Sequence, residues 1–344
     1  MRILYAGRLN PTGTCLARMR GLAELGHMIM PLDFDSHISC RNRIIRGLYN
    51  RLLVGPGINA LNRDLIRRAQ EGRADLVWVD QGAYFWPETL KEIKAKMGAL
   101  LVHHNTDDIV FHKKFFRHYL QALDLYDAHF TSNLHNVEEL GKITTSYVGY
   151  NELGYDDSLF HPMQLGSDDQ NLESDIFFIG HWEKTTEASI RLMVDAGLPV
   201  TIRGPYWPQI NGKRLPAGVV KSGPIYLEDY VKAINGGKIG LGLVSKWNRN
   251  ATAGRIFEIP ACGTLLLAER NPVLAALYED GKEAVFYSTP QEMIDKARYF
   301  LHHPEEREAI AAAGRRRCQA NQCSWRDRVA QVLRELQVQG ILDG

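Results

Sequence analysis

The chain has 344 residues, enough for two domains of ordinary size, and its 45% hydrophobic and 24% charged residues are typical of a globular protein. The formal net charge of +1 provides no field that would attract nucleic acid, so we do not expect nucleic acid as a partner. No apolar stretch approaches the ~20 residues of a membrane span, and the start of the chain carries no signal-peptide pattern, so we expect a cytoplasmic protein.

Short apolar runs that predict strands alternate with helix-length segments along the chain. The runs are 3–6, 28–32, 76–79, 99–102, 128–131 and 146–148 in the first half, and 176–179, 200–202, 219–221, 239–244, 265–268 and 284–287 in the second. This alternation indicates mostly parallel sheets with helices on both faces. Because twelve strands are too many for one ordinary sheet, we predict an α/β protein with two Rossmann-like domains that face each other across a cleft.

A change in composition marks the expected domain boundary. Residues 164–174 are polar and lack periodicity, which predicts a linker. We therefore expect one domain at 1–163 and a second at 175–322. Helical spacing and Pro304 predict three last helices, at 290–302, 305–317 and 325–336. The C-terminal segment 323–344, which contains the last of them, is expected to pack back toward the N-terminal domain.

The first strand is followed by a glycine-bearing turn that leads into a helix. Backbone amides near Gly13 could approach a phosphate there, although an ordinary strand-to-helix turn also explains the pattern. The spacing from Gly7 to Gly13 fits neither GxGxxG nor GxxxxGK[ST]. A dehydrogenase or a nucleoside triphosphatase is therefore disfavoured.

The segment 41–68 departs from the neutrality of the chain, with seven arginines and one acid, Asp64. Apolar residues are interleaved at helix-like spacing. One interpretation is a surface for anionic lipid headgroups or an anionic acceptor, which would place the protein peripherally on the inner membrane face. The other is an ordinary amphipathic helix with a solvated basic face.

Histidines and carboxylates follow the fourth predicted strand in Val-His-His-Asn-Thr-Asp-Asp, 102–108. Such groups could hydrogen-bond a polyhydroxylated substrate or accept its proton, and His104, Asp107 and Asp108 are the candidates. A metal site is less favoured, because His103 and His104 are adjacent and point to opposite sides of an extended chain.

In the second half, the loops after several strands carry groups suited to a nucleotide and a sugar. Amides near His181, together with Lys184, could meet a diphosphate at a helix start. The loop with Ile225 and Tyr226 could recognise a nucleobase through main-chain hydrogen bonds and an apolar wall. Glycine and proline could also shape these loops without any ligand. The segment 245–254 contributes further groups that suit phosphates and sugar hydroxyls: Ser245, Lys246, Asn250 and Thr252.

Arg255 and Glu258 stand at the loop-to-helix junction beyond the strand 239–244. Residues three apart share a helix face, and open α/β sheets bind ligands beyond the carboxyl ends of their strands. An arginine can pair with a phosphate, and a carboxylate can accept hydrogen bonds from a ribose. The pair therefore predicts half of a nucleotide-sugar site. Cys262 is expected to pack as a small buried residue.

The segment 255–263 (Arg-Ile-Phe-Glu-Ile-Pro-Ala-Cys-Gly), followed by 279–287, resembles the glycosyltransferase group 1 proteins of the spore-maturation (CgeB-like) type. The segments 150–162, 304–317 and 324–328 resemble that group as well. The resemblance is close over roughly 175–335 and looser over 1–162. It implies the GT-B fold, with the nucleotide diphosphate sugar bound mainly by the C-terminal domain and the acceptor by the N-terminal one.

The resemblance also implies transfer without a metal or another cofactor, with retention of anomeric configuration. Glu258 matches the second acid of the family's two-glutamate motif, which holds the donor ribose. Asn250 stands where the first acid is usual, so Asn250 or Thr252 is the candidate for the sugar contact. Diphosphate contacts are expected from Arg255, Lys184 and Lys246, and acceptor orientation from His104 or Asp107. The acceptor could be a glycan, a lipid or a protein.

Two other functions stay open at this point. A nucleotide-sugar epimerase or a phosphorylase could use the same fold. A non-catalytic nucleotide-sugar-binding scaffold is the other alternative, since the first acid of the motif is missing.

Overall fold

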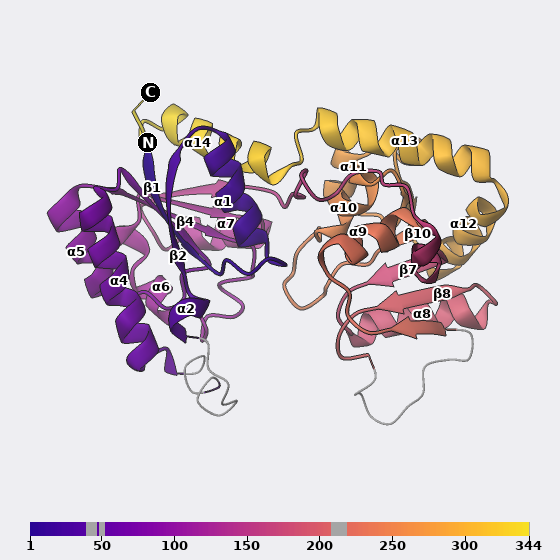
Figure 1. Ribbon diagram of the computed structural model, residues 1–344, viewed down its shortest axis with the longest axis horizontal. Coiled ribbons are helices and arrows are strands. Elements are labelled where there is room, and N and C mark those ends of the chain that lie inside the picture. The colour runs from indigo at the N-terminus through magenta and orange to yellow at the C-terminus, as the bar shows by residue number, and fades with distance from the viewer. Residues whose placement is uncertain (39–46, 48–51, 208–218, 344) are drawn as a thin grey trace. The chain divides into compact units, whose positions relative to one another are not determined.

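The computed structural model describes residues 1–38, 47, 52–207 and 219–343 (Figure 1). The chain forms two compact units, one made of Met1–Glu152 with Trp325–Gly344 and the other of Leu153–Ser324. The chain thus leaves the first unit after Glu152, earlier than the expected boundary at 163, and returns to it at Trp325. Each unit is a six-stranded parallel sheet with helices, which confirms the predicted α/β class with two Rossmann-like domains.

In the first unit the sheet has the order β2-β1-β3-β4-β5-β6. The strands are β1 Arg2–Gly7, β2 Met28–Asp33, β3 Leu76–Asp80, β4 Leu100–Asn105, β5 Ala128–Thr131 and β6 Tyr147–Tyr150. The helices are α1 Thr14–Glu24, α2 Asp35–Ile38, α4 Pro56–Gly72, α5 Pro87–Met97, α6 Arg117–Gln121, α7 Leu134–Gly141 and α14 Trp325–Val338. All six predicted strands are confirmed.

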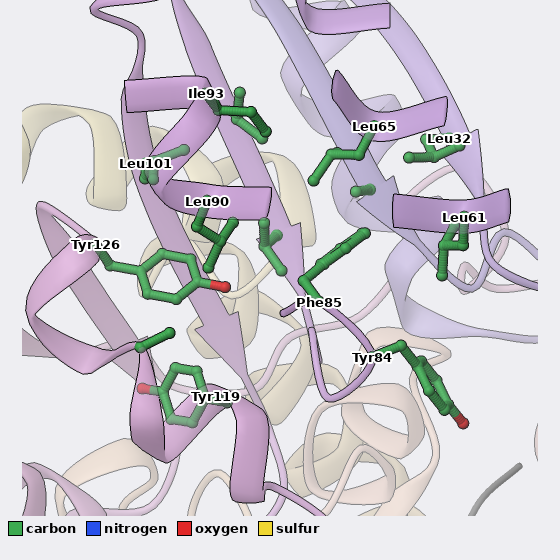
Figure 2. Close-up of a cluster of buried hydrophobic side chains, with 14 of the residues drawn as sticks. Leu32, Leu61, Leu65, Tyr84, Phe85, Leu90, Ile93, Leu101, Tyr119 and Tyr126 are labelled. Atoms are coloured by element: carbon green, nitrogen blue, oxygen red, sulfur yellow. The ribbon is translucent and has the colours of Figure 1, made fainter. Parts of the chain in front are cut away.

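Helices cover both faces of this sheet. Figure 2 shows one face, where Leu61 and Leu65 of α4 and Leu90 and Ile93 of α5 form part of a buried cluster. On the other face α1 and α14 lie side by side (Figure 1), and buried residues of α14 pack into the core that contains Tyr5. The expectation that the C-terminal helix packs back on the N-terminal domain is confirmed.

A buried ion pair lies in this second core. Nε and one terminal nitrogen of Arg18 donate to the Asp80 carboxylate at 2.6 and 2.9 Å, and the Tyr5 hydroxyl also donates to it. The Arg18 guanidinium lies 4.5 Å from the centre of the Trp325 ring. The first residue of α14 thereby contacts the ion pair beside β1 and β3.

In the second unit the sheet has the order β12-β11-β10-β7-β8-β9. The strands are β7 Ser174–Ile179, β8 Val200–Arg203, β9 Val219–Ser222, β10 Gly237–Gly242, β11 Leu265–Glu269 and β12 Val285–Tyr287. The helices are α8 Lys184–Asp195, α9 Leu227–Asn235, α10 Arg255–Ala261, α11 Pro272–Leu277, α12 Pro290–His302 and α13 Pro304–Ala320. The six strands predicted for the second half are confirmed as well.

The segment expected as a linker, 164–174, belongs to this second unit. It contains a 3₁₀ turn at Ser167–Leu172 and ends inside β7. Leu172 is buried, and Asp169 pairs with Lys232 of α9 at 3.2 Å. A terminal nitrogen of Arg203 also donates to the Asn171 carbonyl at 2.9 Å. These contacts hold a segment whose polar composition predicts an unstructured connection.

Candidate functional site

The carboxyl ends of the parallel strands in the second unit meet at one edge of the sheet, and three loops there are joined by hydrogen bonds. The backbone N–H of Lys246, in the loop after β10, donates to the Glu183 carboxylate after β7 at 3.3 Å. Its ammonium group pairs with Glu269, at the end of β11, at 3.0 Å. Asn271 donates to the Ala251 carbonyl at 3.0 Å. The loop after β10 is therefore held from both sides.

Arg255 turns back over the strand ends. Its two terminal nitrogens donate to the carbonyls of Ile179 and Leu243 at 3.1 and 2.7 Å, and its guanidinium lies 4.7 Å from the centre of the Phe178 ring. Its Nε is buried and has no hydrogen-bond partner in the described part of the chain. The structure thus places Arg255 as a brace between β7 and β10, whereas the sequence suggested a phosphate contact.

Glu258 lies in the first turn of α10, and one of its two carboxylate oxygens accepts a hydrogen bond while the other has no partner among the described residues. Its Oε2 accepts a hydrogen bond from the Tyr230 hydroxyl of α9 at 2.5 Å. Within the described residues its Oε1 has no hydrogen-bond partner, and it faces Gly254, where an added Cβ would lie 2.9 Å away. Burial raises the pKa of Glu258, and the Tyr230 hydrogen bond and the Arg255 charge oppose that rise. The site therefore presents a carboxylate acceptor beside a glycine.

The start of α8 carries an exposed cation. Lys184 is exposed, and its side chain forms no hydrogen bond or ion pair with the described residues. The N-cap residue, Glu183, does not cap the helix with its side chain. Its carboxylate instead contacts His181 at 3.0 Å and accepts from the Lys246 backbone. Open helix N–H groups beside a lysine suit an anion.

Other predicted residues occupy the same sheet edge in different ways. Ser245 Oγ accepts from the Trp247 N–H at 3.1 Å, so its hydroxyl shapes the loop. Thr252 is almost fully buried, and Asn250 is partly buried. Ile225 is partly buried and Tyr226 exposed in the loop that leads into α9, the helix that carries Tyr230.

In the first unit, His104 lies inside the core rather than in an open loop. Strand β4 continues to Asn105 and carries His104 against the ring of Trp78, with ring centres 5.8 Å apart. His104 Nε2 lies 3.1 Å from the side-chain oxygen of Asn151. Burial, with the Arg18 charge, lowers the pKa of His104 to about 4. The expectation that His104 orients an acceptor in an open loop is therefore corrected: its ring is a neutral core group.

His103 points to the opposite face of the sheet, as the alternation along a strand requires. It stacks on Tyr119 with ring centres 3.8 Å apart.

Asp107 lies in the loop beyond β4 and is partly buried, and its N–H donates to Asn105 at 3.1 Å. Asp108 is buried and accepts from Asn136 at 2.8 Å, a structural contact. Asp107 remains the candidate of this loop.

Gly13 is the N-cap residue of α1, whose first turn has no acid and no side-chain cap. A Cβ at Gly13 would lie 2.9 Å from the side-chain oxygen of Asn10, so the turn is tight here. The first N–H groups of this helix are thus left without a side-chain cap, which suits an anion.

Among the described residues, no three His, Cys, Asp or Glu side chains gather in a way that could hold a metal ion. The described cysteines, Cys15, Cys262, Cys318 and Cys323, are buried thiols. Within the same described ranges, no helix combines the length and the apolar character of a membrane span.

Two Rossmann-like units with parallel six-stranded sheets define the GT-B fold of glycosyltransferases. A sucrose-phosphate synthase from Thermosynechococcus elongatus has this fold, with a TM-score of 0.67 and 12% identity over 98% of this chain and 99% of its own. Anabaena HepE in complex with UDP and glucose gives 0.63 and 13%, over 98% and 100%. A glycosyltransferase from Rickettsia africae gives 0.66 and 12%, over 100% and 99%.

A family model matches less than half of the chain. The model of the family described as "Glycosyl transferase-like" matches residues 184–334, which begin at the first residue of α8 and end within α14. None of the curated proteins is significantly similar to the chain in sequence. The matched residues include Lys184, Lys246 and Glu258, so the similarity covers the strand ends described above.

Proposed function

We propose that this protein transfers a sugar from a nucleotide diphosphate sugar to an acceptor hydroxyl, without a metal and with retention of anomeric configuration. The family match and the GT-B fold support glycosyl transfer as the class of reaction. The observation that carries the proposal is the Glu258 carboxylate, with one oxygen held by Tyr230 and the other available at the strand ends of the second unit. The retaining outcome and the metal independence rest on the resemblance of 255–263.

Each group has a role in this proposal. Glu258 Oε1 accepts a hydrogen bond from a ribose hydroxyl of the donor. The diphosphate lies at the start of α8, where the helix N–H groups and Lys184 stabilise the charge that develops as the glycosidic bond breaks. Lys246 contributes a second positive charge, which Glu269 partly offsets. Fixed cations and amides thereby supply the stabilisation that a metal supplies in other transferases.

On the acceptor side, Asp107 is the group that we propose to orient the hydroxyl, since His104 is enclosed in the core. The acceptor belongs to one of three classes: glycan, lipid or protein. Membrane contact through 41–68 also remains a proposal, because residues 41–46 and 48–51 lie outside the described part of the chain.

The proposal is tested by comparing nucleosides with nucleoside diphosphates in calorimetric titrations. Lys184→Ala should weaken binding of the diphosphate about tenfold, as expected for the loss of one charge-assisted contact, and leave binding of the nucleoside unchanged. Glu258→Gln should weaken both, because the ribose is common to them. Lys238→Ala is the matched control, since Lys238 lies at the opposite edge of the same sheet and pairs with Asp175.

Transfer is then followed with a labelled donor sugar. A glycosylated acceptor, absent in the Glu258 variant, is the expected product. Binding that is unchanged in both site variants would refute the site. Release of a free sugar phosphate or an epimerised donor would point to the phosphorylase or epimerase alternative, and binding without turnover to the scaffold.

A further inference from the structure

The described part of the basic segment 41–68 is largely neutralised. On α4, Arg67 and Arg68 both pair with Asp64, and Arg67 also pairs with Glu71 at 2.6 Å. These arginines therefore stabilise their own helix and leave little net charge for a partner. On the same helix Arg63 is exposed, and a denser group of cations lies elsewhere in the first unit, at Lys113, Lys114 and Arg117.

The segment 109–118, beyond β4, combines exposed aromatic rings with cations. Phe111 and Phe115 are 59% and 54% exposed. The side chains of Lys113, Lys114 and Arg117 form no hydrogen bond or ion pair with other described residues, and the segment contains no acid. Exposed aromatic rings gathered beside cations are typical of a surface that meets an external partner.

A second exposed apolar segment lies against this one. The imidazole of His118 donates from Nε2 to the carbonyl of Leu53 at 3.2 Å. Leu53 is buried and has a φ of 53°, an unusual backbone conformation for a branched residue. Its neighbours Leu52 and Val54 are 44% and 46% exposed. The segments 52–54 and 109–118 thus both expose apolar side chains close to the hydrogen bond between His118 and Leu53.

We propose that this surface, defined by Leu52, Val54, Phe111, Phe115, Lys113, Lys114 and Arg117, docks on an anionic lipid bilayer. The phenylalanine rings would enter the boundary between headgroups and acyl chains, and the cations would contact headgroup phosphates. A purely anionic polymer would match the cations but would leave the exposed apolar side chains in water. The combination of both features favours lipid, and this inference is independent of the proposed transfer reaction.

The experiment is sedimentation of the full chain with vesicles of phosphatidylglycerol and phosphatidylcholine, against vesicles of phosphatidylcholine alone. We expect binding to the anionic vesicles only, and weaker binding at high salt. Lys113→Gln with Lys114→Gln should weaken binding about 25-fold, or fivefold for each cation. Phe111→Ser with Phe115→Ser should weaken it at least about tenfold, since each ring loses apolar burial.

Val338→Ser is the matched control, because Val338 is 82% exposed on α14 and should not change binding. Circular dichroism spectra establish that each variant is folded. Failure of the wild-type chain to bind anionic vesicles would overturn the inference. So would a phenylalanine variant that binds as well as the wild type, since the surface would then be a site for a water-soluble polyanion.

Discussion

Acidification should unfold the first unit before the second, because buried histidines are confined to one of them. His103, His104 and His129 are at most 1% exposed. Burial lowers the pKa of His104 and of His129 to about 4, and that of His103 well below its ordinary value. In the second unit the histidines are exposed, which makes that unit an internal reference: His161, His181, His302 and His303.

The magnitude follows from proton linkage. The folded pKa values lie below the unfolded one, so the unfolded state binds protons first as the pH falls. Stability is therefore complete above about pH 7 and declines from about pH 6.5 toward pH 4. With pKa values of about 4 in the folded state, each of His104 and His129 costs about 2 kcal/mol between pH 8 and pH 5. Together they remove about 4 kcal/mol of a typical 5–15 kcal/mol.

The charged neighbours of His104 do not change over this range. Although burial opposes it, Arg18 holds the pKa of Asp80 below its ordinary value, so Asp80 stays ionised at pH 5. Hydrogen exchange, corrected for the intrinsic pH dependence, measures the effect unit by unit. Protection in β3, β4 and β5 should fall at least about a thousandfold from pH 8 to pH 5, the equivalent of the 4 kcal/mol from His104 and His129, to which His103 adds. Protection in β10 should change little.

A double variant, His104→Gln with His129→Gln, should remove most of this pH dependence even if it lowers stability at pH 8. The control is His302→Gln, because that side chain is exposed. Equal loss of protection in both units of the wild type, or an unchanged slope in the double variant, would refute the assignment of the acid sensitivity to these two rings.

Two further substitutions test the packing of each unit. Asp80→Asn should cost about 3–5 kcal/mol in urea unfolding, because it leaves the Arg18 charge buried without its carboxylate; a loss below about 1 kcal/mol would contradict this. Gly204→Ala should unfold much of the second unit, since the new Cβ would lie 2.1 Å from the carbonyl oxygen of Gly180 and Gly204 has a φ of 152°. Gly197→Ala is the control, because Gly197 also has a positive φ, of 78°, but no atom lies within 4 Å of the new Cβ, so the comparison isolates the clash from the backbone strain. Equal melting temperatures for these two alanine variants would contradict the packing argument.

The sequence predicted the strands well because each is an apolar run set between helix-length segments. It failed at the end of β4, where His103, His104 and Asn105 indicated a loop. Polar residues can continue a buried strand when partners are brought to them by the fold. Those partners, Tyr119 and Asn151, lie outside any local pattern, so only the tertiary structure could show that both rings are enclosed.

The sequence indicated which loops form the candidate site, but it did not indicate which side chains contact one another there. The rule that ligands bind beyond the carboxyl ends of parallel strands located Glu258 and Lys184. The roles of Tyr230 and Glu183 depend on how α9 and the loop after β10 are placed, and no spacing in the sequence indicates them. Asp169 and Leu172 likewise fix a segment that composition alone suggested was a linker.

Arg255 and Lys184, two of the cations of the site, differ in whether their side chains already have hydrogen-bond partners. The terminal nitrogens of Arg255 donate to the carbonyl at the end of β7 and to the carbonyl at the start of the loop after β10. A phosphate could bind these nitrogens only by breaking hydrogen bonds that join the two strands. Lys184 has no such bonds to lose and stands where the α8 amides are open. A diphosphate that binds at this edge should therefore meet Lys184 and the helix start, while Arg255 keeps the two strands that carry those groups in register.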